Sequence, residues 1–161
     1  MLLGRTTTVV VVLISTALIG ALIALHEGEM IAVARYDREP GPGDHAEVAF
    51  AVVDDQQGRG LGTRLLELLT SYARSHGIRQ FRAFVLGENR QMMRVFRNSG
   101  YELSRTLDSG VFTVDFPVTE SEESLAAEAD HEKRAVAASL LPLFFPRSVA
   151  VIGASNDRSS I

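Results

Sequence analysis

The sequence predicts an α/β fold of the α+β type, with a mixed, mostly antiparallel central sheet and flanking helices. Two strand–turn–strand patterns and one apolar strand indicate the sheet, and two amphipathic segments of helical period lie between the strands. The chain has 161 residues, of which 46% are hydrophobic and 22% charged, so it is globular and not disordered. This length accommodates one hydrophobic core and a short extension.

The first part of the chain is apolar. Val9–Leu25 is uncharged, and its length is at the short limit for a membrane-spanning helix, which needs about 20 residues. A signal peptide and one or two buried strands are the other interpretations, and the β-branched valines favour strands. Because Ala21–Leu25 is required for the sheet, we expect residues 1–20 to be an apolar segment of a cytoplasmic protein without a membrane partner.

Strands follow the apolar segment. Ala21–Leu25 and Met30–Tyr36 are predicted to pair as a hairpin, because Gly28 between them suits a tight turn. Glu47–Val53 is a mostly apolar run, typical of a strand that is covered on both faces. The remaining strands are expected at Phe81–Leu86, Tyr101–Thr106 and Val111–Val118, the last two forming a hairpin around Asp108-Ser109-Gly110.

Two helices are predicted between these strands. Leu61–Tyr72 has apolar residues at helical spacing, and Gly77 suits the end of that helix. Asn89–Ser99 repeats the helical pattern and is followed by Gly100.

A third helix is predicted after the last hairpin. It begins at Thr119, whose spacing to Glu122 is that of a capping box, and Leu141-Pro142 ends it. Since it is acidic and rich in alanine, with few large apolar residues, residues 119–142 are predicted to be a linker helix.

Charge is unevenly distributed along the chain. The net charge of −4 argues against a general nucleic-acid binder, so no nucleic-acid partner is expected. Arginine dominates between Gln57 and Arg105, and acidic residues dominate between Glu120 and Glu132, which indicates a middle region that binds a polyanionic small molecule. The chain has no cysteine, and its four histidines share no metal-ligand spacing, so no metal site is predicted.

A glycine-rich turn lies between the strand Glu47–Val53 and the first helix. Its glycines are Gly58, Gly60 and Gly62. They allow backbone N–H groups to point toward one place at a helix N-terminus, where the dipole is positive and a pyrophosphate fits. Arg59 or Arg64 could add charge-assisted hydrogen bonds. The alternative is a turn that merely requires glycine.

Gln57-x-x-Gly60-x-Gly62 matches the acyl-CoA binding motif, Q/R-x-x-G-x-G/A, of the GNAT superfamily of N-acetyltransferases. QGRGLGTRLLELLTSYARSHGI resembles that family's loop and helix, and VLGENRQMMRVFRNSGY resembles its next strand end and helix. The resemblance covers about residues 21–118. It implies a GNAT-like fold that is incomplete at the N-terminus, because the family fold begins with a strand and two helices before the hairpin.

The resemblance also implies a co-substrate, acetyl-CoA, and a place for it. In this family the central strand and the next one splay apart, and the pantetheine arm lies in the gap. The residues implied to bind the co-substrate are Val52, Gln57, Gly58, Arg59, Gly60, Leu61, Gly62, Thr63 and Asn89.

Glu47 is the candidate catalytic residue. In this family an amine attacks the thioester directly, and the amine must be neutral, so a general base is useful. Glu47 is the only carboxylate in its apolar strand, where partial burial is expected to raise its pKa. Its segment resembles the A-E-F/V-A strand of the bacterial protein lysine acetyltransferases, whose glutamate is the proposed base. The alternative is an exposed acid at the start of a strand.

One position departs from the family pattern. Many members have a tyrosine where this chain has Phe96, and that tyrosine protonates the departing thiolate. The general acid is therefore unassigned, and Tyr72 and Tyr101 are expected to be core aromatics.

PRSVAVIGAS, near the end of the chain, resembles the opening of the CoA-binding domain of NDP-forming acyl-CoA synthetases, although a chance strand and turn is the alternative. We therefore expect residues 143–161 to be a stub of such a domain, and the chain to be truncated at both ends.

The function expected from these resemblances is an acyl-CoA-dependent N-acetyltransferase. Its predicted acceptor is a protein lysine, on a partner such as an acyl-CoA synthetase. The alternatives are a CoA-binding sensor without turnover and a small-molecule amine acetyltransferase.

Overall fold

The computed structural model describes residues 9–15, 19–41 and 43–144. The strands described are β1 (Val9–Ser15), β2 (Ile19–His26), β3 (Glu29–Arg38), β4 (His45–Val52), β5 (Gln80–Leu86), β6 (Ser104–Asp108) and β7 (Val111–Pro117). The helices described are the short 3₁₀ turn η1 (Asp54–Gln56), α1 (Leu61–Ser75), α2 (Arg90–Arg97) and α3 (Glu122–Phe144).

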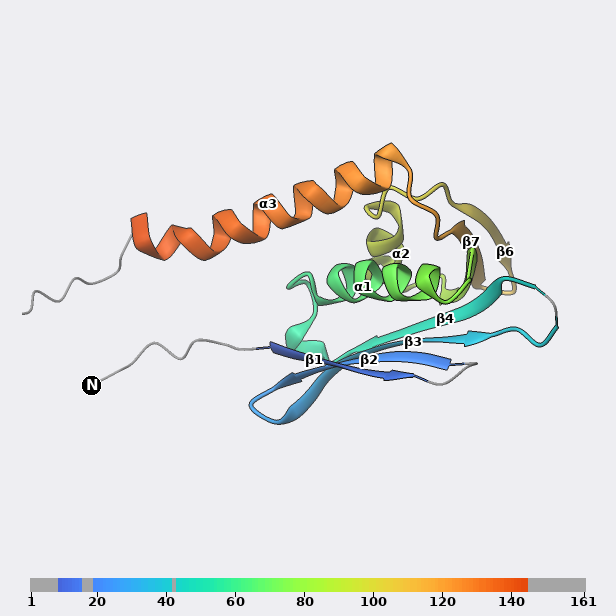
Figure 1. Cartoon of the computed structure of the whole chain (residues 1–161), viewed down its shortest axis with the longest axis horizontal. Helices are drawn as coiled ribbons and strands as arrows, with labels where there is room; N and C mark the ends of the chain where they lie inside the picture. The colour runs from blue at the N-terminus through green and yellow to red at the C-terminus, as the bar shows by residue number, and fades with distance from the viewer. Residues whose placement is uncertain (1–8, 16–18, 42, 145–161) are drawn as a thin grey trace, which may run out of the picture. The chain divides into compact units, whose positions relative to one another are not determined.

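The seven described strands form one sheet in the order β1-β2-β3-β4-β5-β7-β6 (Figure 1). Neighbouring strands are antiparallel except β4 and β5, which are parallel. The predicted mixed, mostly antiparallel sheet with flanking helices is therefore confirmed.

The apolar N-terminal segment contributes a strand. Val9–Ser15 pairs along its whole length with β2, so the strand interpretation of these valines is confirmed. None of the helices in the described ranges combines the length and the apolar character needed to cross a membrane. Residues 1–8 lie outside the described part of the chain.

Both predicted hairpins form, and the same kind of turn closes each. Glu27 and Gly28 have φ of 52° and 86°, and Ser109 and Gly110 have φ of 49° and 82°. Two successive positive φ values define the type I′ turn, whose twist matches that of the flanking strands. The second hairpin starts at Ser104, later than predicted from the sequence.

Helices α1 and α2 cover one face of the sheet. The buried side of α1 carries Leu65, Leu66 and Leu69, and it packs on β2, β3 and β4. Next to them lies a cluster of aromatic rings from β4, β5, α2, β7 and the loop before β6: Phe50, Phe81, Phe96, Phe116 and Tyr101. This layer between helices and sheet is the hydrophobic core.

The sheet divides between β4 and β5. Only three parallel pairs join these strands, and the last of them is Glu47 with Arg82. Beyond that pair the strands diverge, as the family resemblance implied. Phe96 of α2 packs against both halves, with its ring centroid 6.0 Å from that of Phe50 on β4 and 5.2 Å from that of Phe116 on β7. Helix α2 therefore spans the division.

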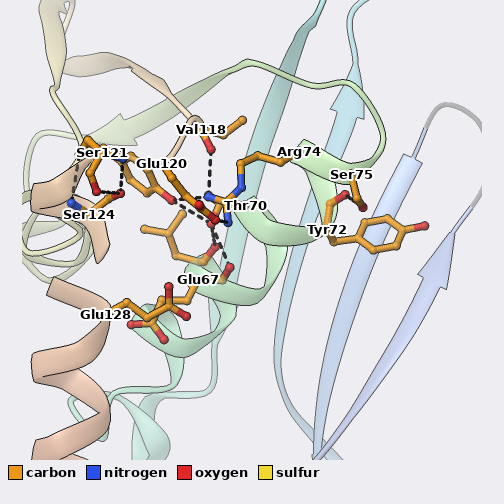
Figure 2. Close-up of polar contacts among 12 residues, drawn as sticks. Glu67, Thr70, Tyr72, Arg74, Ser75, Val118, Glu120, Ser121, Ser124 and Glu128 are labelled. Atoms are coloured by element: carbon orange, nitrogen blue, oxygen red, sulfur yellow. Dashed lines mark hydrogen bonds and ion pairs between the residues drawn. The ribbon is translucent and has the colours of Figure 1, made fainter. Parts of the chain in front are cut away.

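The segment after β7 is attached to α1 (Figure 2). The guanidinium of Arg74 donates to the Val118 carbonyl at 3.1 Å and pairs with Glu120 at 2.8 Å. The Tyr101 hydroxyl donates to Thr70 at 3.2 Å. The two contacts of Arg74 join α1 to the chain that leads into α3, and the contact of Tyr101 joins α1 to the loop after α2.

Helix α3 begins later than predicted. Its capping pair is Ser121 and Ser124, whose backbone N–H groups donate to each other's hydroxyl oxygens at 2.9 and 3.1 Å, and the expected pair of Thr119 and Glu122 was wrong. The helix also continues two residues past Pro142, so the predicted end at Leu141-Pro142 was wrong.

The chain divides into two compact units after Glu128. The described part of the second unit is the remainder of α3, in which Asp130 and Arg134 form an ion pair. Most of the predicted synthetase-like stub, residues 145–161, lies outside the described residues, so it stays a prediction.

Candidate functional site

A cavity of about 520 Å³ lies where β4 and β5 diverge, bordered by the glycine turn and α2. This volume is within the range of small-molecule sites. Eight of the nine predicted co-substrate residues line it: Val52, Gln57, Gly58, Gly60, Leu61, Gly62, Thr63 and Asn89. Arg59 is exposed and is not among the lining residues.

The glycine turn presents free backbone donors to this cavity. Gly58 and Gly60 have φ of 73° and 84°, and Gly60 is the N-cap of α1 without a side-chain cap. The nearest backbone hydrogen bonds start at Gln57 and Arg64, and in the described part of the chain none starts from residues 58–63. Since the first turn of a helix lacks internal acceptors, these amides can bind an anion.

The side chain of Gln57 stabilises the start of the glycine turn by hydrogen bonds. Its side-chain amide donates to the Val52 carbonyl at 3.1 Å and to the Asp54 carboxylate at 2.8 Å. These contacts tie the end of β4 to η1. Gln57 therefore lines the cavity and also holds the glycine turn in position.

Helix α2 forms the opposite wall. Asn89 caps it, accepting a hydrogen bond from the Met92 N–H at 2.9 Å. The two helices approach closely at Gly62, where an added Cβ would lie 3.4 Å from the Val95 methyl group. A larger side chain at position 62 would narrow the cavity.

Nine lining residues were not predicted from the sequence: Phe50, Gln56, Leu86, Glu88, Gln91, Met92, Arg94, Val95 and Asn98. Four of them share one side of α2, at positions 91, 94, 95 and 98. The helical period could have identified these four once Asn89 was assigned to the site. Phe50 and Leu86 line the cavity because their strands part, which no local pattern indicates.

Glu47 lies at the point of divergence, but its side chain is exposed, so the predicted burial was wrong. It alternates with Ala46 and Val48, which are buried on the helix-covered face, and so it lies on the opposite face. The alternation holds because one face of β4 packs against helices and the other is open.

The charged neighbours of Glu47 come from both adjacent strands. It is in register with Asp37 on β3 and with Arg82 on β5. The Arg82 guanidinium donates to Asp115 at 2.7 Å and lies 3.6 Å from Glu39. Its hydrogen bond to Asp115 raises the pKa of Arg82, followed by the charges of Asp115 and Glu39. Asp37 is paired with Arg35 at 2.8 Å, so Glu47 is the carboxylate of this group that has no ion pair among the described residues.

Comparison with known families supplies the deciding observation. The model of the acetyltransferase (GNAT) family matches residues 13–101, which is more than half of the chain. The chain belongs to the GNAT acetyltransferase family.

Several named relatives resemble this GNAT domain. Acetyltransferase Pat of Mycolicibacterium smegmatis is 42% identical over 73 residues, which cover 45% of this chain and 22% of that protein. The L-methionine sulfoximine/L-methionine sulfone acetyltransferase of Pseudomonas aeruginosa is 35% identical over 80 residues, covering 48% of this chain and 46% of that protein. The chain thus matches less than half of the length of either curated relative.

Solved structures agree with this assignment. The GNAT domain of S. lividans PAT has a TM-score of 0.56 and 42% identity, covering 62% of this chain and 60% of that one. The structure of yncA from Salmonella typhimurium with its cofactor acetyl-CoA has a TM-score of 0.55 at 21% identity, covering 65% of this chain and 67% of that one, which shows a shared fold. The predicted co-substrate is confirmed at the level of the family, since GNAT enzymes use acetyl-CoA.

Three aromatic residues of this GNAT domain that the sequence singled out, Phe96, Tyr101 and Tyr72, pack in or against the core. Phe96 is fully buried between the two halves of the sheet. Tyr101 packs on Phe116, and its hydroxyl contacts Thr70. Tyr72 packs against Tyr36. Tyr72 and Tyr101 are therefore core aromatics, as predicted.

Proposed function

We propose that this domain transfers the acetyl group of acetyl-CoA to a primary amine, and that the acceptor is a protein lysine. The observation that carries the proposal is the set of free amides at residues 58–63, which open into a cavity where the sheet divides. A diphosphate beside these amides gains hydrogen bonds and the favourable end of the α1 dipole.

The pantetheine arm occupies the gap between β4 and β5. The backbone of β4 beyond Glu47 has no partner on β5, so its polar groups are free to bind the amides of the arm. Phe50, Val52 and Leu86 supply apolar contacts there. The thioester then lies near the last strand pair, beside Glu47.

Glu47 acts as the general base in this proposal. It removes a proton from the acceptor ammonium, directly or through one water, and the neutral nitrogen attacks the thioester carbon. The C–N bond forms, the C–S bond breaks and CoA leaves as a thiolate. The attacking nitrogen gives its second proton to solvent, the thiolate takes a proton from solvent, and Glu47 then releases its own, so that one proton is released overall. Positioning of the two reactants supplies most of the remaining acceleration.

The face that carries Glu47 supports a cationic acceptor. Asp37 is paired with Arg35, and Arg82 is paired with Asp115 and Glu39, so Glu47 is an exposed carboxylate without an ion pair among the described residues. Such a carboxylate attracts a lysine ammonium on another protein. The resemblance of the segment around Glu47 to the protein lysine acetyltransferases supports the same choice, and an acyl-CoA synthetase is the acceptor to test first.

The test measures CoA release from acetyl-CoA with two acceptors, an acyl-CoA synthetase and L-methionine sulfone, and with buffer alone as the control. Acceptor-dependent release, with acetyl-lysine identified by mass spectrometry, is the expected result. Release with the sulfone alone would indicate a small-molecule enzyme. Calorimetric binding of CoA without transfer to any acceptor would indicate a sensor module, and absence of CoA binding would overturn the proposal.

A further inference from the structure

One wall of the cavity carries a cation that has no assigned role. Helix α2 presents Gln91, Arg94, Val95 and Asn98 to the cavity, and these positions form one stripe of the helix. Arg94 is the only charged member of the stripe. Its side chain is exposed, and among the described residues no carboxylate lies within ion-pair distance of it.

The stripe faces the glycine turn. An added Cβ at Gly58 would lie 3.9 Å from the side-chain nitrogen of Gln91, and one at Gly62 would lie 3.4 Å from Val95. Arg94 is adjacent to Val95 and one turn from Gln91, so it projects from the wall that lies across from the free amides.

The other arginines near the turn are less suited to this position. Arg59 does not line the cavity. Arg64 is paired with Glu67 at 3.1 Å, and Glu128 lies 3.9 Å from it. Glu88 is the one acidic residue of the described lining, and it forms no ion pair with Arg94. An unpaired guanidinium beside free amides is a site for a phosphate group.

We infer that Arg94 binds a phosphate group of acyl-CoA from α2, across the cavity from the amides of residues 58–63. The inference rests on the proposed function. CoA carries phosphate in two places, the diphosphate and the 3′-phosphate of the ribose, and the guanidinium recognises the chemistry that both share. Arg94 thereby selects the phosphorylated donor over the pantetheine fragment.

The experiment measures the binding of CoA, dephospho-CoA and pantetheine to the full chain by calorimetry. Pantetheine is measured by its competition with CoA. Arg94→Gln is expected to weaken CoA binding about 10- to 100-fold, with no change for pantetheine. A loss that persists with dephospho-CoA assigns the diphosphate, and a loss that disappears assigns the 3′-phosphate. Arg90→Gln, on the same helix but outside the cavity, is the matched control and should bind all three ligands as wild type does.

Two results would overturn the inference: unchanged CoA binding by the Arg94→Gln variant, or an equal loss for CoA and pantetheine. Failure of the proposed function is distinguishable, because then the unmodified chain itself does not bind CoA. Thermal unfolding of each variant identifies a folding defect, and Arg94→Lys, which keeps the charge, should recover part of the affinity.

Discussion

Glu47 of β4 and Arg82 of β5 are the last residues at which these two parallel strands are paired. On one side of this pair the sheet is continuous, and on the other it opens into the cavity. The carboxylate of Glu47 therefore lies where the pairing ends, on the open face of the sheet. The position of Glu47, and not its burial, is what makes it the candidate base.

The first prediction concerns Glu47. Glu47→Gln removes the proton acceptor and keeps the size of the side chain, so kcat/KM for an amine acceptor should fall about 10²- to 10⁴-fold. CoA binding should be unchanged, because Glu47 does not line the cavity. Thiol release and calorimetry check the two parts. Asp37→Asn, on the adjacent strand, is the control and should cost far less; equal losses in both variants would reduce Glu47 to part of a general acidic surface.

The second prediction concerns Gly60, whose φ of 84° lies in the left-handed region. Gly60→Ala should destabilise the fold by about 1 to 2 kcal/mol and should reorient the turn, weakening CoA binding about tenfold. Gly28→Ala is a matched control, because Gly28 has φ of 86° and, as at Gly60, an added Cβ would meet no atom within 4 Å. It should show the same loss in urea denaturation without any effect on CoA. Loss of CoA affinity in both variants would contradict the assigned role of the turn.

The third prediction concerns the contact between the end of α2 and the start of α3. An added Cβ at Gly100 would lie 2.5 Å from the Glu123 carbonyl oxygen, and φ there is 76°. Gly100→Ala should therefore lower the free energy of unfolding by about 2 to 4 kcal/mol. Gly110→Ala has a similar φ and open space, so it should cost only the backbone strain. Equal urea midpoints for the two variants would contradict this prediction, because they would mean that α3 shifts away from the added methyl group without a loss of unfolding free energy.

The fourth prediction concerns alkaline pH. Burial is the largest cause that raises the pKa of Tyr36 above its ordinary value of 10.0, followed by the charge of Tyr72. The folded state thus keeps the phenol proton at a pH where the unfolded chain releases it, so stability is retained below pH 10.0 and falls as the pH rises above it. Tyr36→Phe should show a smaller loss of unfolding free energy between pH 8 and pH 10.5. If the unfolding free energy of the unmodified chain and that of the Tyr36→Phe variant fell equally with pH, Tyr36 would not be the cause of the loss.

Local patterns identified the hairpins and the first two helices, because turn glycines and helical spacing are read within a few residues. The start of α3 was misplaced, since Thr119 with Glu122 and Ser121 with Ser124 have the same spacing. In the observed structure, which uses Ser121 and Ser124, Gly100 lies close to the backbone of residues 123 and 124. A contact between residues so far apart in the sequence cannot be predicted from a local pattern.

The candidate site was also predicted only in part, because local patterns identify some of its residues and not others. The glycine turn and Asn89 are marked by residue type, whereas Phe50 and Leu86 reach the cavity only because strand pairing stops. The exposure of Glu47 was not predicted because its apolar strand was interpreted as covered on both faces. Ala49 and Ala51 lie on the open face, and such small apolar residues do not distinguish an open face from a covered one.

The ring of Phe96 fixes the distance between the two halves of the sheet, because it touches Phe50 on one side and Phe116 on the other. It therefore acts as a spacer between the two halves. In the proposed function the pantetheine arm binds in a gap that this ring holds open, so little of the binding free energy is needed to separate the strands.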